Sequence, residues 1–149
     1  MKNASIAFHR ADLKSLRKLN EVFGEAFGEP ETFKEAKPSD EYLNSLLASD
    51  TFIPLVAIID GKVVGGLAAY VLRKYEQERK EIYIYDLAVS EEYRRRHIAT
   101  GLINKLREIA REIGAWVIFV QADPPDEPAI KLYESLGTRE EVFHFDILP

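Results

Sequence analysis

Residues 86–100 of this chain read DLAVSEEYRRRHIAT. They follow an apolar run, and they predict a buried strand, a turn, a loop rich in hydrogen-bond donors, and then an amphipathic helix. A loop at the N-terminus of a helix is a place where phosphate binds, because free backbone N–H groups and the helix dipole both favour anions. The stretch therefore predicts a phosphate-bearing cofactor bound close to one carboxylate, that of Asp86.

The rest of the sequence predicts one mixed α/β domain over residues 1–149, with elements in the order βααβββαβαβ. Asp60-Gly61 predicts a hairpin turn between two of the strands. The strand at 81–89 is the most hydrophobic and is expected to be central, the strand at 116–121 is expected to be buried, and 29–38 and 73–80 are expected to be loops. Alternation and helical periodicity predict the remaining strands at 5–9, 52–59, 63–71 and 138–147, and helices at 13–24 or 13–28, 40–47, 100–113 and 128–136.

Composition narrows the class of protein. The 149 residues carry a formal net charge of -5 and no cysteine. The absence of cysteine excludes disulfides, thiolate zinc sites and a cysteine nucleophile, and it fits a cytoplasmic protein. An acidic chain is a poor binder of nucleic acid but suits a cationic ligand. The apolar runs are too short to span a bilayer, so we expect no membrane partner.

Asp86 has two interpretations. Burying a carboxylate costs several kcal/mol unless it is paired or hydrogen-bonded. It is either an acid at a strand bulge, satisfied by amides or an arginine, or a general base whose pKa is raised by an apolar setting. The pattern favours the base.

The three consecutive arginines also have two interpretations. They are either a solvated surface patch or, because they lie between a strand and a helix, bidentate partners for a pyrophosphate.

Other polar residues carry weaker signals. Tyr133 lies on an apolar helix face, which predicts a core residue with its hydroxyl at the rim. The histidines have no metal-ligand spacing, so we predict no metal. Four acids near the C-terminus suggest solvation and helix capping, Asp126 being a natural cap, or an anionic pocket for a polyamine: Asp123, Asp126, Glu127 and Asp146.

Two motifs resemble the GNAT superfamily of acetyl-coenzyme A (acetyl-CoA) dependent N-acetyltransferases. Residues 94–99, RRRHIA, match both ends of the family's Arg/Gln-x-x-Gly-x-Gly/Ala loop, and residues 126–137 match its Asn-x-x-Ala-x-x-x-Tyr helix with Asp126 in place of asparagine. Five segments are similar to gentamicin-type aminoglycoside 3-N-acetyltransferases: 52–53, 68–72, 81–90, 120–123 and 139–146. The resemblance implies a mixed, mostly antiparallel sheet flanked by helices, with acetyl-CoA at the splay between the fourth and fifth strands.

The resemblance also implies roles for single residues. Asp86 would take a proton from the attacking amine, and Tyr133 would lie close to the sulfur. Backbone groups of Leu87, Ala88 and Val89 would meet the acetyl group and the pantetheine arm. We expect the cationic aminoglycoside to meet Tyr85, Asp123, Asp126, Glu127 and Asp146. The pyrophosphate would lie in the loop formed by Arg94, Arg95, Arg96, His97, Ile98, Ala99 and Thr100.

One departure from the pattern is His97, which replaces the loop glycine. If this position needs a positive φ, histidine costs stability or cofactor affinity; if φ is helical, the imidazole simply points outward.

Two other functions stay open. One is acetylation of another polyamine or of a protein lysine, and the other is a non-catalytic acyl-CoA sensor. We also consider a homodimer, for which the sequence carries no signal.

Overall fold

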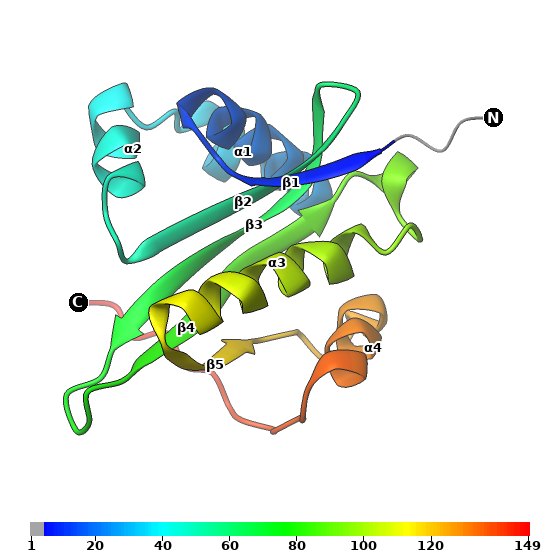
Figure 1. Ribbon diagram of the computed structural model, residues 1–149. Helices are drawn as coiled ribbons and strands as arrows, with labels where there is room; N and C mark the ends of the chain where they lie inside the picture. Colours follow the sequence, from blue (N-terminus) through cyan, green and yellow to red (C-terminus); the bar gives the residue numbers. More distant parts are fainter. Residues whose placement is uncertain (1–4) are drawn as a thin grey trace. The chain divides into compact units, whose positions relative to one another are not determined.

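The computed structural model describes residues 5–149, and the chain divides into two compact units with the boundary between Phe119 and Val120. A five-stranded sheet runs in the order β1-β2-β3-β4-β5 (Figure 1). Strands β1 to β4 pair antiparallel, and β5 runs parallel to β4 after a helical crossover. The strands are β1 (Ile6–Arg10), β2 (Phe52–Ile59), β3 (Lys62–Arg73), β4 (Lys80–Val89) and β5 (Ala115–Val120).

Three helices cover the sheet in the first unit. They are α1 (Leu13–Phe27), α2 (Asp40–Leu47) and α3 (Ile98–Ile113). Helices α1 and α2 pack on one face and α3 on the other (Figure 1). The core on the first face joins α1 and α2 to alternate strand residues such as Phe52, Val56 and Ala68. The mixed, mostly antiparallel sheet flanked by helices is therefore confirmed.

Local signals in the sequence explain where these elements begin and turn. The Asp12 carboxylate accepts a hydrogen bond from Ser15 N at 2.8 Å, and Asp12 N donates to Ser15 Oγ at 2.9 Å, which caps α1. Gly28 ends α1 with φ 63°. The hairpin between β2 and β3 has positive φ at both Asp60 (49°) and Gly61 (77°), as a type I′ turn requires.

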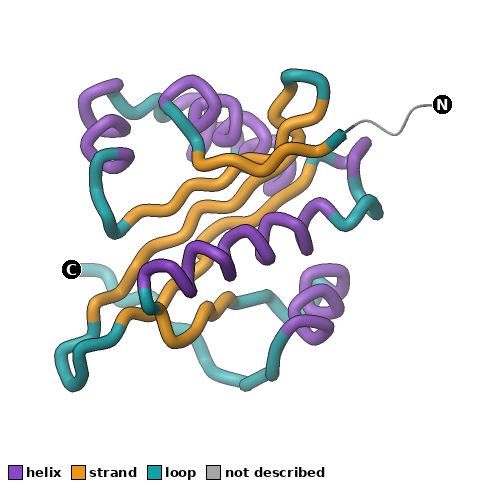
Figure 2. The backbone as a smooth tube through the Cα atoms, in the orientation of Figure 1, coloured by secondary structure: helices purple, strands orange, loops and turns teal. Residues whose placement is uncertain are grey.

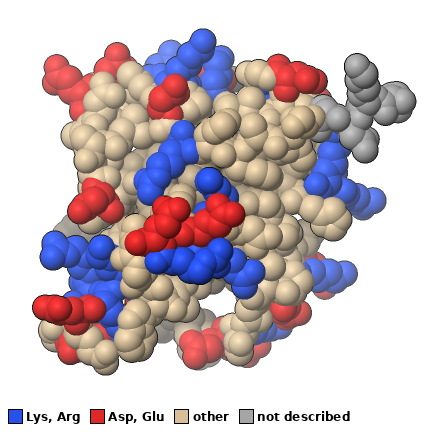
Figure 3. Space-filling model, viewed as in Figure 1, with Lys and Arg blue, Asp and Glu red and all other residues tan. Residues whose placement is uncertain are grey.

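The exposed face of α3 mixes charges of both signs. Figure 3 shows basic and acidic side chains interspersed on this side of the molecule, and Lys105 Nζ lies 3.5 Å from a Glu108 oxygen. Exposed pairs of this kind contribute little stability. Within residues 5–149, no helix combines the length and apolar character that a bilayer span needs.

The second unit, Val120–Pro149, contains one regular element, α4 (Glu127–Leu136). Asp126 caps it by accepting a hydrogen bond from Ala129 N at 3.3 Å, as predicted, and Gly137 follows its last turn. The strand predicted at 138–147 is wrong, because these residues form no ladder and appear as loop in Figure 2. An extended segment becomes a strand only when its backbone pairs with a neighbour, and alternation alone does not supply one.

Three smaller expectations also need correction. Residues 31–35, expected to be loop, form a short π-helical turn, η1 (Glu31–Glu35). Strand β3, and not β4, occupies the middle of the sheet. Strand β5 is not buried: Trp116 is 66% and Val117 46% exposed, because β5 is the last strand in the order and has only one neighbour.

Candidate active site

A bulge in β4 determines where Asp86 points. Ala68 pairs with Asp86 and the next residue of β3, Ala69, pairs with Ile84, so Tyr85 is an extra residue with no partner in the ladder. Directly paired residues share a face of the sheet. Because Ala68 packs in the core under α1 and α2, Asp86 lies on that same face.

The Asp86 carboxyl is half-buried, less enclosed than the apolar sequence around it suggests. Burial raises its pKa above the ordinary value, and the nearby negative charge of Glu29 raises it further. Both causes disfavour the ionised form, so this carboxylate accepts a proton more readily than a solvated aspartate does. Asp86 therefore lies at a bulge and also has the raised pKa expected of a base.

Aromatic rings line the sheet next to this carboxylate. Tyr83 stacks on Phe119 of β5 with ring centroids 4.8 Å apart, and Tyr85 lies 5.6 Å from Tyr83. Tyr85 also meets Tyr70 of β3 edge-on at 6.0 Å, and Tyr70 lies 5.3 Å from Phe52 of β2. The site residue predicted at position 85 is thus part of a row of rings that crosses four strands.

The donor-rich loop joins β4 to α3 through a short 3-10 turn, η2 (Glu91–Tyr93). Arg95 and His97 both adopt the left-handed conformation, with φ of 64° and 60°. Helix α3 begins at Ile98, and its first intrahelical bond runs from Gly101 N to the His97 carbonyl at 3.0 Å. The N–H groups of residues 98–100 therefore precede the helical ladder, which is the arrangement expected of an anion site.

The arginine side chains contribute in another way than expected. Arg94 Nε donates a hydrogen bond to the carbonyl of Val89 at 3.1 Å, which fixes the loop against the end of β4. The Arg96 guanidinium lies over the Tyr93 ring, 5.3 Å from its centroid. Two of the three guanidiniums thus hold the loop in place, and the groups that can bind an anion are the backbone N–H groups of residues 98–100.

His97 has a positive φ, the first of the two alternatives considered for this position. Its φ of 60° lies in the region that favours glycine, and its side chain makes no capping hydrogen bond to α3. The left-handed region costs a residue with a Cβ about 1–2 kcal/mol. The strained alternative is therefore correct, and the imidazole is exposed while the following residue, Ile98, is buried.

A surface hollow on the first unit reaches Arg94 of the loop but does not include Asp86. It is lined by α1, by the turn between β2 and β3, and by Ser90, Glu91, Glu92 and Arg94, and its rim carries charges of both signs. The bulge and the loop therefore define the candidate site, and this hollow does not.

The remaining predicted site residues belong to the second unit. Asp126 caps α4, Glu127 is the first residue of that helix, and the Asp146 carboxylate lies 2.9 Å from His144 Nε2. The backbone carbonyl of Asp123 accepts a hydrogen bond from Asp126 N at 2.9 Å. The roles proposed for these acids and for Tyr133 toward cofactor and substrate stay predictions.

Two residues beside Asp86 were missed by sequence reasoning. Glu29 lies in a segment expected to be loop, and Tyr70 was taken only as part of a strand. Their proximity to Asp86 is visible in the shifts of pKa, since Glu29 raises that of Asp86 and Asp86 raises that of Tyr70. Only the pairing of β3 with β4 could have indicated Tyr70, and no local pattern indicates Glu29.

Comparison with known proteins places this geometry in a family. Residues 16–138 match the model of the acetyltransferase (GNAT) family. The fold is that family's, with an open sheet and parallel β4 and β5. Solved structures with this fold include complexes with CoA.

Two solved structures are particularly similar. One is an aminoglycoside acetyltransferase, HMB0005, from an uncultured soil metagenomic sample; it is 53% identical, with a TM-score of 0.96 over 97% of this chain and 99% of that chain. Another, meta-AAC0020 from a similar source, is 34% identical with a TM-score of 0.88, over 97% of this chain and 96% of that one, and was solved in complex with sisomicin.

A curated relative is more distant. The probable N-acetyltransferase camello of Xenopus laevis is 31% identical over 99 residues, which is 66% of this chain and 44% of that protein. The chain spans about half the length of the curated relatives that it matches.

Proposed function

The chain belongs to the GNAT family of acetyltransferases, and from that premise we propose that it moves an acetyl group from acetyl-CoA to an amino group of an aminoglycoside. The observation that carries the proposal is the Asp86 carboxyl, held at a strand bulge with a raised pKa, on the strand that leads into the anion loop. Two similar structures are those of aminoglycoside acetyltransferases, which supports this substrate class. Within it, we propose a gentamicin-like acceptor and its 3-amino group.

The loop from Arg94 to Thr100 fits the pyrophosphate of CoA. Left-handed residues at 95 and 97 turn successive backbone N–H groups, and those of 98–100 open a helix of 16 residues. Such amides bind anions through direct hydrogen bonds and the helix dipole. Acetyl-CoA supplies an activated thioester, while the chain's own contribution here is to hold the cofactor's phosphates.

Asp86 is proposed as the base. An aminoglycoside amine is largely protonated at neutral pH and must lose a proton before it can attack a thioester. The half-buried carboxylate accepts that proton, directly or through one water. Backbone groups of Leu87 to Val89, which continue β4 beyond the bulge, are proposed to orient the acetyl carbonyl and to bind the developing oxyanion.

Tyr133 is proposed as the group that orients the departing thiolate through a hydrogen bond. Burial, together with the charge of Asp126, raises the pKa of Tyr133 to about 12. The side chain is therefore a neutral phenol at neutral pH, so it can donate a hydrogen bond to the thiolate as the C–S bond breaks, and the thiolate then takes its proton from solvent. A thiol of pKa near 8.5, by analogy with cysteine, leaves readily with such assistance.

The remaining acids are proposed to attract the other ammonium groups of the acceptor. Asp123, Asp126, Glu127 and Asp146 all lie in the second unit, and the whole chain carries a net charge of -5. Exposed charge pairs weaken as ionic strength rises, so the KM for the acceptor should increase with salt.

The test is thiol release from acetyl-CoA in the presence of gentamicin, kanamycin, spermidine or a lysine peptide. Release with the two aminoglycosides alone, and an acetylated 3-nitrogen identified by NMR of the product, would support the full proposal. Release only with spermidine or the peptide would assign another acceptor. Tight CoA binding without release with any amine would instead indicate the acyl-CoA sensor.

A further inference from the structure

Three exposed tyrosines from three different elements gather around Tyr70, the ring that lies near the Asp86 carboxyl. Tyr70 of β3 and Tyr85 of β4 meet edge-on at 6.0 Å, and Tyr42 of α2 lies close enough for its charge to raise the pKa of Tyr70. Their exposed fractions are 39% for Tyr70, 63% for Tyr85 and 59% for Tyr42. Rings that served only the core would be covered, so these three present aromatic surface to solvent.

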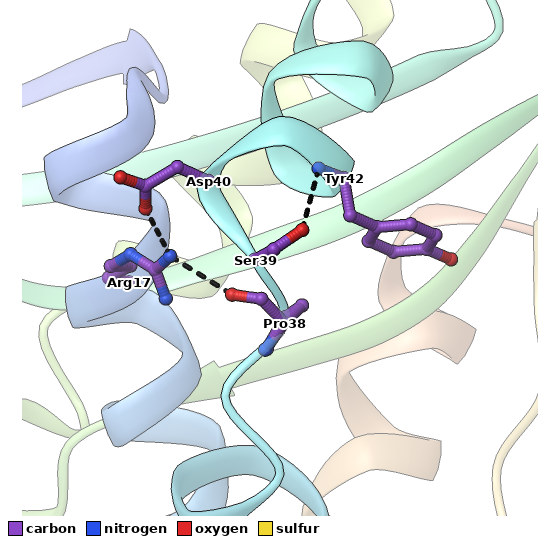
Figure 4. A network of polar contacts seen from close by, with 5 residues as sticks. All are labelled: Arg17, Pro38, Ser39, Asp40 and Tyr42. Atoms are coloured by element: carbon purple, nitrogen blue, oxygen red, sulfur yellow. Dashed lines mark hydrogen bonds and ion pairs between the residues drawn. The ribbon is translucent and has the colours of Figure 1, made fainter.

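Helix α2 is anchored in a way that directs Tyr42 toward this surface. Arg17 of α1 donates a hydrogen bond to the Pro38 carbonyl at 3.0 Å and forms an ion pair with Asp40. Ser39 Oγ accepts from Tyr42 N at 3.1 Å and so caps the helix. Figure 4 shows the Tyr42 ring pointing away from this polar cluster.

Glu29 approaches Asp86 from the end of α1. Glu29 N donates to the Gly24 carbonyl at 3.0 Å, and the Glu29 carbonyl accepts from Phe33 N at 3.2 Å. Phe33 packs against Phe23, with ring centroids 5.8 Å apart. The Glu29 backbone is therefore held in an ordered turn although its side chain is exposed.

We propose that Tyr42, Tyr70 and Tyr85 form an aromatic wall that binds the apolar face of a saturated ring, and that Glu29 binds a second ammonium of the same molecule while Asp86 receives the reacting one. The inference rests on the proposed function and narrows its acceptor to rigid rings that carry at least two amino groups. Aromatic faces attract both the C–H surface of such a ring and its cations. A flexible linear polyamine gains less from a flat wall.

Glu29→Gln tests the second ammonium site. Its KM should increase about three- to fivefold for kanamycin or neamine, whereas the Ki of glucosamine, a competitor with a single amine, should stay unchanged. The Kd for CoA should not change, because the loop is not altered, and the pH at which kcat is half-maximal should fall, because the charge that raises the pKa of Asp86 is removed. Glu25→Gln, an exposed acid one turn earlier on α1, is the matched control and should behave as wild type. Equal changes for kanamycin and for glucosamine, or no change for either, would overturn the role of Glu29.

Tyr42→Ser tests the wall with little risk to folding, since this side chain is largely exposed. The KM for kanamycin should increase about fivefold while the Ki of spermidine as a competitor of kanamycin stays within twofold, and Tyr42→Phe should retain the wild-type KM. Tyr75→Ser is the control, because Tyr75 is 97% exposed in the turn between β3 and β4. A wild-type KM in Tyr42→Ser, or an equal loss for spermidine, would overturn the wall.

Calorimetric titration of kanamycin into the CoA complex separates this inference from the proposed function. Tight binding that is weakened in Glu29→Gln and Tyr42→Ser, without turnover of acetyl-CoA, would support the wall and overturn the proposed reaction. Turnover with all variants equal to wild type would support the proposed reaction and overturn the wall. No binding and no turnover would overturn both.

Discussion

The bulge at Tyr85-Asp86 and the loop from Arg94 to Thr100 lie on one continuous stretch of chain, but they are built by opposite means. At the bulge, strand register brings particular side chains to one face, and their chemistry is the site. In the loop the side chains are largely exposed, and left-handed backbone at 95 and 97 sets the direction of the amides. Side-chain identity therefore matters at the bulge, whereas φ matters in the loop.

The largest effect that this comparison predicts is at the bulge. Asp86→Asn keeps the shape of the side chain but removes the proton acceptor, so kcat for aminoglycoside acetylation should fall by about 10²- to 10⁴-fold. The Kd for CoA, measured by titration calorimetry, should be unchanged because the loop is intact. Glu92→Gln, an exposed acid of the 3-10 turn, serves as the control. Near-wild-type turnover in Asp86→Asn would remove Asp86 from the reaction.

In the loop, a change of backbone preference should matter more than a change of charge. His97→Val places a β-branched residue at φ 60°, which should cost about 1–2 kcal/mol of stability and raise the Kd for CoA about tenfold. His97→Gly should bind CoA at least as well as wild type. Glu92→Val is the matched control, because Glu92 is exposed in the adjacent 3-10 turn and has no positive φ. Equal CoA affinity in the valine and histidine proteins would show that the left-handed conformation is not required.

Stability should depend on pH at the bulge in a defined direction. The pKa of Asp86 is higher in the folded chain than its ordinary value, so folding favours the protonated form. The stabilising contribution is present at acid pH and is lost as pH rises through the folded-state pKa. Asp86→Asn should therefore have a higher urea midpoint than wild type at pH 8, and the difference should shrink toward pH 4. A difference that grows on acidification would reverse the sign of the shift.

The smallest effect concerns the second unit. Asparagine caps helices as well as aspartate, so Asp126→Asn should unfold at nearly the wild-type temperature, whereas Asp126→Ala should lose about 1 kcal/mol. If the carboxylate also attracts the acceptor, the KM for kanamycin should rise about twofold in Asp126→Asn at low salt. An unchanged KM would leave Asp126 with its capping role alone.

Local chemistry made much of the fold predictable. The sequence predicted Asp126 as a helix cap and Asp60-Gly61 as a hairpin turn, because each acts on backbone groups within a few residues of itself. The order of strand, donor loop and helix from 81 to 113 was predictable for the same reason. These elements alone place Asp86 on the strand that leads into the donor-rich loop.

What sequence could not supply is nonlocal. The proximity of Glu29 to Asp86 depends on how α1 ends over the sheet, and no residue type in the sequence indicates that arrangement. The alternation at Phe143 and Phe145 indicated a strand without a partner to pair with. The sequence left the sign of φ at position 97 open, because histidine adopts both signs. Only the backbone of the folded chain determines it.

The extra residue in β4 has a consequence for how such a site can arise or disappear. Before the bulge, even-numbered residues such as Ile82 and Ile84 are buried in the layer under α3; after it, even-numbered residues such as Ala88 pack beneath α1. In a strand of regular phase, Asp86 would fall in line with the two isoleucines, inside the hydrophobic layer. Gain or loss of one codon in this strand therefore does what no single substitution can, by moving a carboxylate from one side of the sheet to the other.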